Sequence, residues 1–172
     1  MARVALVTGK SLPNLSVDDQ MVLPQLSALG IEPVIALWDD LTVDWGTFDG
    51  VVLRSLPDYH LRVAEFDEWL GALNRDGARV WNPTAVLRWN SEKSYLLELQ
   101  KRGVQIVPTV VVSRDRVVDL PYVLRSNNWT KAVIKPAIAT NGYNTWLTES
   151  TTAQGDQRLM MSMMVHGDVL VQ

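Results

Sequence analysis

The sequence predicts an α/β protein whose N-terminal half is a doubly wound βαβ domain. Short apolar runs of strand length alternate with stretches that have the periodicity of amphipathic helices. The expected helices are bounded by Ser or Asn at their starts and by Gly at their ends. A chain of 172 residues has room for one ordinary domain or two small ones. We expect two domains, one at residues 1–88 and one at residues 89–172.

The first half has the pattern of strands joined by helices. Residues 3–8 form a continuous apolar run rich in Val, which is typical of a buried strand. Ser16 and Asp19 have the spacing of a capping box, so a helix should begin there. Its first turn should be irregular before Pro24, and Gly30 suits its end. The other elements expected in this half are strands at residues 32–38, 50–54 and 79–81 and a helix at residues 63–74.

The helix at residues 63–74 has one apolar face. Phe66, Trp69, Leu70 and Leu73 recur at positions i, i+3, i+4 and i+7. Right-handed crossovers between the strands would give a parallel sheet. The carboxyl ends of parallel strands then form a crevice in which ligands bind. Polar residues directly after each strand are therefore the first candidates for a site.

The second half continues the alternation. A helix is expected at residues 91–102, capped by Asn90 or Ser91 and ended by Gly103. That assignment places Lys93 in the first helical turn, where the helix dipole disfavours a cation unless an anion lies beside it. The other elements expected in this half are strands at residues 110–113, 132–135, 145–148 and 169–172 and helices at residues 120–127 and 154–165.

The chain stops inside an apolar strand, whereas chains usually end in frayed polar residues. We therefore expect the sequence to be the first part of a longer protein. The alternative is a short domain whose last strand is central in its sheet.

Composition and charge exclude several classes of function. The formal net charge is −3 and the pI is about 5.3, which argues against a nucleic-acid or anionic-membrane surface. With no cysteine there is no disulfide, thiolate nucleophile or cysteine metal site. Two histidines, each beside an acid, make a metal site improbable. The N-terminus has the pattern of a strand rather than a signal peptide, so a cytoplasmic location is expected.

Polar side chains follow the third and fourth expected strands. Arg54, Ser55, Asp58 and Tyr59 come after the third strand, where they could clamp a small polar substrate with carboxylate and amine groups. Asn82 follows the fourth strand and could present an amide to the same ligand. The structural alternatives are a turn in which Arg54 pairs with a surface acid, and a strand-to-helix turn at Asn82.

Two lysines in the second half point to an anion. Lys135 ends an apolar strand, and a partly buried ammonium needs an anionic partner. The polar loop at residues 137–144 contains one glycine and could fold over phosphates. Lys93 is open to two interpretations, a phosphate ligand or a solvated surface lysine. Neither a Walker A loop nor a Gly-x-Gly-x-x-Gly loop is present.

Taken in order, these residues resemble the ATP-grasp superfamily, in particular its glutathione-synthetase-like branch, which includes enzymes of the O-ureidoserine cyclo-ligase type. The run around Lys93, followed at a distance by Ile134-Lys135-Pro136, is the most specific part of the resemblance. The stretches that carry it are ALWDD (36–40), DW (44–45), FDGVVLRSLPDY (48–59), FDEWL (66–70), WNPTAVLRWNSEKSYLLELQKRG (81–103), VPT (107–109) and VIKPAIATNG (133–142).

The resemblance implies a pre-ATP-grasp domain followed by the first part of an α+β ATP-grasp domain. It implies that Lys93 and Lys135 hold the phosphates of ATP and that Gln172 reaches the hinge at the adenine edge. The flap over the phosphates would contain Thr140, Asn141 and Gly142.

Such enzymes use ATP and Mg²⁺ to phosphorylate a carboxyl group or a comparable acceptor, which a nitrogen nucleophile then attacks. Arg54, Ser55 and Asp58 fall where this branch would meet an amino-acid-like acceptor. The magnesium ligands belong to a second half that would follow Gln172, so none is expected within this chain.

Three functional hypotheses follow. The first is a C–N bond-forming, ATP-dependent ligase present as an N-terminal part that is inactive alone. The second is a non-catalytic α/β module that binds a small metabolite or a protein. The third is a homodimer formed by pairing of residues 169–172 across subunits. No nucleic-acid or membrane partner is expected.

Overall fold

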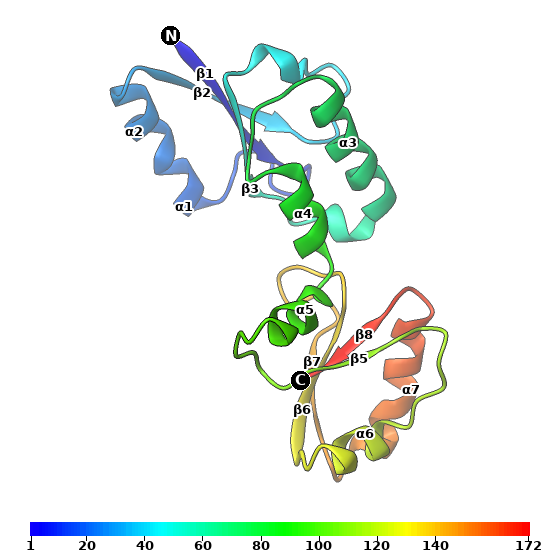
Figure 1. The fold of residues 1–172 in the computed structure, drawn as a ribbon. Coiled ribbons are helices and arrows are strands. Elements are labelled where there is room, and N and C mark those ends of the chain that lie inside the picture. Colours follow the sequence, from blue (N-terminus) through cyan, green and yellow to red (C-terminus); the bar gives the residue numbers. More distant parts are fainter. The chain divides into compact units, whose positions relative to one another are not determined.

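The computed structural model describes residues 1–172. The chain folds into two compact units, residues 1–89 and residues 90–172. Each unit contains one four-stranded sheet with its own hydrophobic core (Figure 1). The fold class expected from the sequence, α/β in the first half and α+β in the second, is confirmed.

The sheet of the first unit is parallel and has the order β2-β1-β3-β4. The chain passes from β1 to β2 on one side and then crosses back to β3 on the other side of β1. The strand order therefore reverses between β1 and β3, and ligands of doubly wound sheets bind at the carboxyl ends of the strands at such a point. The strands are β1 (Ala2–Thr8), β2 (Ile31–Leu37), β3 (Gly50–Ser55) and β4 (Val80–Trp81).

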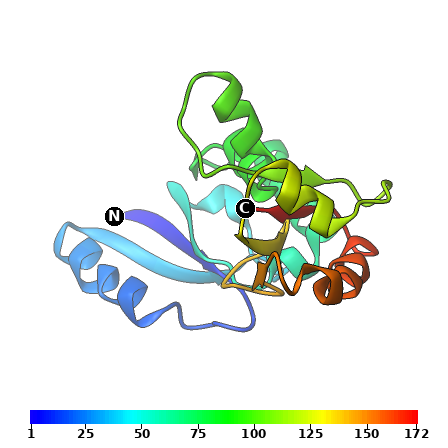
Figure 2. The ribbon, with the colours of Figure 1, turned by 90° about the horizontal axis from the view of Figure 1, so that it is seen from below.

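Helices cover both faces of this sheet. Ser16 caps the first helix by accepting the Asp19 backbone N–H at 3.1 Å, as the capping-box spacing predicts. The helix breaks at Met21, three residues before Pro24, and Gly30 follows its end with φ +75°. In Figure 2 the two blue helices lie alongside β2. The helices of this unit are α1 (Val17–Gln20), α2 (Val22–Ala28), α3 (Val63–Arg75), α4 (Thr84–Ser91) and the short 3-10 turns η1 (Trp45–Thr47) and η2 (Tyr59–Leu61).

Helix α3 supplies the core of the first unit. Its four predicted apolar residues are all buried, which confirms the periodicity. They pack with Trp38 and Trp45 against one face of the sheet. Trp38 meets the Phe66 ring edge-on with centroids 5.7 Å apart, and Trp45 meets Trp69 at 5.3 Å. Aromatic pairs of this geometry add to the stabilisation from burial.

The predicted helix at residues 91–102 is wrong in its start. Asn90 and Ser91 do not precede a helix, because both belong to the last turn of α4, which continues to Ser91. Pro83 accepts the first hydrogen bonds of α4, from Val86 and Leu87, so the proline begins this helix where its missing N–H does no harm. The next helix, α5 (Tyr95–Lys101), begins only after Ser94. Lys93 therefore lies in the turn between two helices and not in a first helical turn.

The second unit is built on an antiparallel sheet with the order β5-β8-β6-β7. Strand β8 is central, between β5 and β6. The core lies between one face of this sheet and helices α6 and α7, where Leu120, Leu124, Ile134 and Met160 are fully buried. The elements are β5 (Val110–Val112), α6 (Leu120–Ser126), β6 (Lys131–Pro136), β7 (Trp146–Glu149), α7 (Ala153–Met164) and β8 (Val169–Val171).

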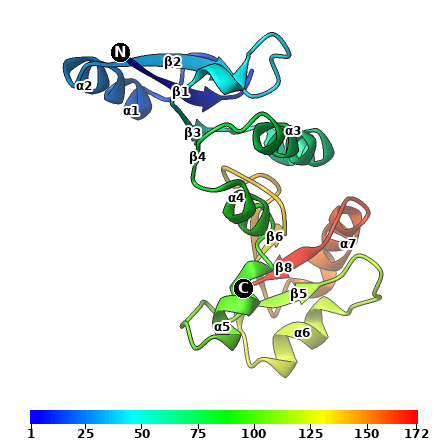
Figure 3. The same ribbon diagram turned by 45° about the horizontal axis from the view of Figure 1, so that its top comes forward.

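The opposite face of this sheet is not covered by α6 and α7. Figures 1 and 3 show these two helices on one side of the strands and α5 on the other. Lys135 pairs with Leu170 across the ladder, and Leu170 pairs with Val111. Since directly paired residues project to the same side, these three residues share the face away from α6 and α7. None of the helices in either unit has the length and hydropathy needed to cross a bilayer.

Candidate functional site

Lys93 is fixed in the turn between α4 and α5 by its backbone and its side chain. Its N–H donates to the carbonyl oxygen of Ala137 at 2.9 Å. Its ammonium Nζ donates to the carbonyl oxygen of Ala139 at 2.6 Å. Both acceptors belong to the loop after β6, so Lys93 ties the chain between the helices to that loop. The ammonium is partly buried without a carboxylate partner.

Lys135 stands on β6 near Lys93. Burial lowers the pKa of Lys93, and the positive charge of Lys135 lowers it further. Burial also lowers the pKa of Lys135. Neither ammonium forms an ion pair, whereas Lys131, on the same face of the same strand, pairs with Glu149 at 2.7 Å. Two partly buried cations without an ion-pair partner at one place have the chemistry to bind an anion.

The loop that Lys93 contacts has an unusual backbone. Asn141, Gly142 and Asn144 all have positive φ, at 51°, 71° and 46°. Two turns hold it, closed by hydrogen bonds from Tyr143 N–H to Thr140 oxygen and from Thr145 N–H to Gly142 oxygen. Asn and Gly are the residues that adopt this region most readily. The predicted flap residues thus form a compact loop of turns beside Lys93.

Gln172 continues β8 along β6. Its backbone exchanges hydrogen bonds with Val133 at 2.9 and 2.6 Å, and its side-chain amide donates to Thr109 Oγ1 at 2.7 Å. Because Val133 is two residues from Lys135, Gln172 lies on the same face of the sheet as Lys135. The structure therefore brings Lys93, Lys135 and Gln172 together with the loop. Thr109, which holds the Gln172 side chain, was not predicted.

In the first unit, Arg54 and Ser55 are both held by Asp19 of α1. The Arg54 guanidinium donates to Asp19 Oδ1 from Nε at 2.8 Å and from a terminal nitrogen at 2.5 Å. The Ser55 hydroxyl donates to Asp19 Oδ2. Burial raises the pKa of Asp19, but hydrogen bonds from Ser55, Arg54 and Ser16 and the charge of Arg54 outweigh it and bring the pKa below 3.8. Asp19 was missing from the predicted site.

Replacing Asp19 with Asn is expected to lower the free energy of unfolding at pH 7 by about 1–2 kcal/mol, since Arg54 is half exposed and solvent weakens the pair. Because the pKa of Asp19 is lower in the folded chain than in the unfolded one, its contribution is complete above pH 3.8 and is lost as the pH falls further. The variant should therefore depend less on pH in acid. Thermal melts between pH 2 and 7 test this. Exposed Asp18→Asn is the matched control, and equal acid profiles of both variants and the wild type would contradict the role given to Asp19.

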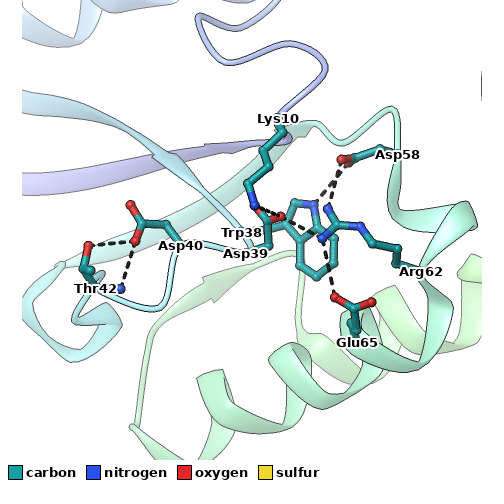
Figure 4. Close-up of polar contacts among 8 residues, drawn as sticks. All are labelled: Lys10, Trp38, Asp39, Asp40, Thr42, Asp58, Arg62 and Glu65. Atoms are coloured by element: carbon teal, nitrogen blue, oxygen red, sulfur yellow. Dashed lines mark hydrogen bonds and ion pairs between the residues drawn. The ribbon is translucent and has the colours of Figure 1, made fainter.

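Asp58, Tyr59 and Asn82 have three different environments. Asp58 accepts from the Trp38 indole Nε1 at 3.2 Å and pairs with Arg62 at 3.1 Å (Figure 4). The Tyr59 ring packs on Phe66 with centroids 4.8 Å apart. Asn82 is exposed after β4. Of the residues predicted in this unit, Arg54 and Ser55 thus form one cluster and Asp58 belongs to another.

The second cluster surrounds Arg62, the residue directly before the start of α3. Its guanidinium lies over the Trp38 ring at 4.4 Å and bridges Asp58 to Asp39, 2.7 Å away. Lys10 also reaches Asp39, at 3.0 Å. Burial raises the pKa of Asp39, but Arg62 and Lys10 outweigh this and hold it below 3.8. Sequence reasoning missed Lys10, Asp39 and Arg62, although Lys10 and Asp39 each stand two residues beyond the end of a strand.

Residues 4–82 match the family model of the N-terminal domain of D-cycloserine synthetase DcsG. The cycloserine biosynthesis protein DcsG of Streptomyces lavendulae is 36% identical over 113 residues, which cover 66% of this chain and 38% of that protein.

Solved structures share the fold. The crystal structure of DcsG superposes with a TM-score of 0.88 at 26% identity, covering 99% of this chain and 59% of that one. A RimK domain ATP-grasp protein from Sphaerobacter thermophilus gives a TM-score of 0.71 at 21% identity, covering 99% of this chain and 63% of that one. The ATP-grasp ligase PsnB in complex with a precursor, Mg and ADP gives 0.53 at 18% identity, covering 98% and 64%.

The parallel sheet of the first unit, the antiparallel sheet of the second and these superpositions show that the chain has the fold of the ATP-grasp proteins. The chain is similar to the D-cycloserine synthetase DcsG in both sequence and fold. The chain spans less than two thirds of the length of each of these relatives.

Proposed function

We propose that this chain is part of an ATP-dependent ligase that phosphorylates a small acceptor and joins it to a nitrogen nucleophile. The observation that carries the proposal is the pair of partly buried ammonium groups of Lys93 and Lys135, which have no carboxylate partner. The triphosphate of ATP is an anion that would compensate both charges. The similarity to DcsG and to other ATP-grasp proteins supports this assignment.

Each part of the second unit has a role in this proposal. Lys93 and Lys135 bind phosphate oxygens and neutralise the charge that develops on the transferred phosphoryl group. The loop containing Thr140, Asn141 and Gly142 lies over the phosphates and keeps water from them. Gln172, on the same face as Lys135, offers its amide to the adenine.

The first unit, a pre-ATP-grasp domain in this proposal, binds the acceptor. Arg54 and Ser55 stand at the carboxyl end of β3, and Asp19 fixes their orientation. An arginine held in this way retains exposed donors that fit an acceptor carboxylate. Its side chain is 48% exposed, so such a ligand can reach it.

Magnesium is the cofactor expected of this chemistry, and it prefers oxygen ligands such as carboxylates. No three acidic or histidine residues of the chain are grouped so that they could hold a metal ion. The residues present do not fit a magnesium site.

Calorimetric titration with MgATP tests the proposal. Lys93→Ala and Lys135→Ala should each weaken binding by about tenfold or more, since each removes a charge-assisted hydrogen bond to phosphate. Lys131→Ala is the matched control, because Lys131 lies on the same face of β6 but is exposed and paired with Glu149. Equal affinities of all three variants would contradict the proposal. A chain that binds small amino acids but ignores MgATP would instead be a non-catalytic binding module.

A further inference from the structure

A second cluster of charges lies where the strand order of the first unit reverses. Lys10 follows β1, Asp39 follows β2, and Asp58 follows β3. All three residues therefore come from carboxyl ends of neighbouring parallel strands, which is the edge where doubly wound sheets bind ligands. Arg62, one residue before α3, completes the cluster (Figure 4).

Rigid contacts hold Asp39 in place. Arg62 stacks on Trp38 and donates to Asp39 at 2.7 Å and to Asp58 at 3.1 Å. Asp58 in turn accepts the Trp38 indole N–H and packs against Gly9, where a Cβ atom would lie 2.2 Å from Asp58 Oδ1. The indole itself is buried in the core. The cluster is thus anchored on one side by the apolar core.

One oxygen of Asp39 is buried without a hydrogen-bond partner. Lys10 and Arg62 both bind Oδ2, whereas Oδ1 has no partner. The Asp39 side chain is only 6% exposed. A buried carboxylate oxygen that lacks a donor is costly in free energy, so the site has unused capacity for one more N–H group.

The ammonium of Lys10 occupies the position that the cationic group of a ligand would take. The Lys10 side chain is 66% exposed and reaches only Oδ2 of Asp39. Displacing Lys10 from Asp39 therefore breaks few contacts. Three carboxylates, those of Asp39, Asp58 and Glu65, form ion pairs with two bases, Lys10 and Arg62. The surplus of negative charge favours a cationic group. A free ammonium, unlike Lys10, has no backbone tether that prevents it from bridging both oxygens.

We propose that Asp39 binds the ammonium group of a small α-amino acid and that Lys10, displaced from Asp39, binds the carboxylate of the same molecule. The exchange conserves charge, because the zwitterion brings one cation to Asp39 and one anion to Lys10. This inference rests on the proposed function, since it makes the acceptor an amino acid and gives it a subsite at the carboxyl ends of β1 and β2.

Three small molecules distinguish binding through the ammonium from binding through the carboxylate. Alanine carries both groups, ethylamine lacks the carboxylate, and propionate lacks the ammonium. Each probe is titrated into ¹⁵N-labelled chain and followed at the Trp38 indole N–H and the Gly9 and Lys10 amides. The affinity should be highest for alanine, lower for ethylamine and lowest for propionate, with a loss of at least tenfold at each step. Both enantiomers of alanine are titrated.

Variants then assign the groups. Asp39→Asn should abolish binding of alanine and ethylamine, while Asp40→Asn, at a half-buried acid whose carboxylate accepts from Thr42 in the same turn, should leave both intact. Lys10→Met removes an exposed side chain and should not impair folding. This variant should bind alanine only as tightly as ethylamine, and its affinity for ethylamine should not fall.

The proposal is overturned if propionate binds as well as alanine, if Asp40→Asn matches Asp39→Asn, or if alanine causes no saturable shift at these resonances. These titrations contain no nucleotide. Loss of MgATP binding in the Lys93 and Lys135 variants without alanine binding would reject this inference alone, whereas alanine binding without MgATP binding would reject the proposed function.

Discussion

Replacing Gly9 with Ala is expected to lower the free energy of unfolding by about 2–4 kcal/mol. The new methyl group would lie 2.2 Å from Asp58 Oδ1 and 2.9 Å from its Cγ. Asp58 cannot simply turn away, because the Trp38 indole and Arg62 hold its two oxygens. Either these charge-assisted contacts break or the backbone between β1 and α1 moves. A urea titration followed by tryptophan fluorescence measures the effect.

Two comparisons isolate the cause of this loss. Gly155→Ala, inside α7 with no atom within 4 Å of the added Cβ, should stabilise the chain by about 0.5–1 kcal/mol. In the background of Asp58→Ala, Gly9→Ala should cost less than it does alone, because the clashing carboxylate is gone. If Gly9→Ala costs the same in both backgrounds, the close approach of Asp58 is not its cause.

Replacing Lys93 and Lys135 together with Met should weaken MgATP binding by more than about a hundredfold, since two charge-assisted contacts with phosphate are lost. The free energy of unfolding should not fall in the way that the affinity for MgATP does. Lys135 has no acidic partner and its burial disfavours the charge, so Lys135→Met alone should leave the free energy of unfolding unchanged or higher. A residue that weakens the fold and serves binding is expected at a functional site.

Lys101→Met, in the last turn of α5 and exposed, is the control for this pair. It should change neither binding nor stability beyond about 0.5 kcal/mol. A double Lys93 and Lys135 variant that binds MgATP like the wild type would mean that the two cations serve the fold or another ligand.

Local sequence signals predicted the first unit well because its elements follow local rules. The apolar run of β1, the Ser16 cap, the break before Pro24 and the apolar face of α3 each depend on residues close in sequence. The parallel direction of the strands, which the crossover connections predicted, is confirmed. These features need no knowledge of distant contacts.

The helix at residues 91–102 was misplaced because competing signals lie close together. Ser91 and Asn90 are good capping residues, but Pro83 and the helix formers after it begin a helix earlier, and Leu87 packs on the core. The argument from a helix dipole at Lys93 therefore fails. Lys93 is instead placed by its contacts with Ala137 and Ala139, more than forty positions away.

The ion-pair clusters could not be predicted from local pattern. Asp19 reads as part of a helix cap, yet its carboxylate holds Arg54 and Ser55, 35 and 36 positions away. Arg62 lies between a turn and a helix, and only the fold places it on Trp38 between two carboxylates. Such pairings depend on the packing of α1 and α3 on opposite faces of the sheet.

The central claim is that Lys93 and Lys135 bind the phosphates of ATP, and NMR of reductively ¹³C-methylated lysines tests it residue by residue. The chain has lysines at only Lys10, Lys93, Lys101, Lys131 and Lys135, so Lys→Arg variants assign every signal. MgATP should shift the Lys93 and Lys135 resonances and raise both pKa values, because an anion stabilises the charged form, while the other three signals stay in place. Saturable binding of MgATP that moves only the signals of Lys10, Lys101 or Lys131, or no response from Lys93 and Lys135, would contradict the account.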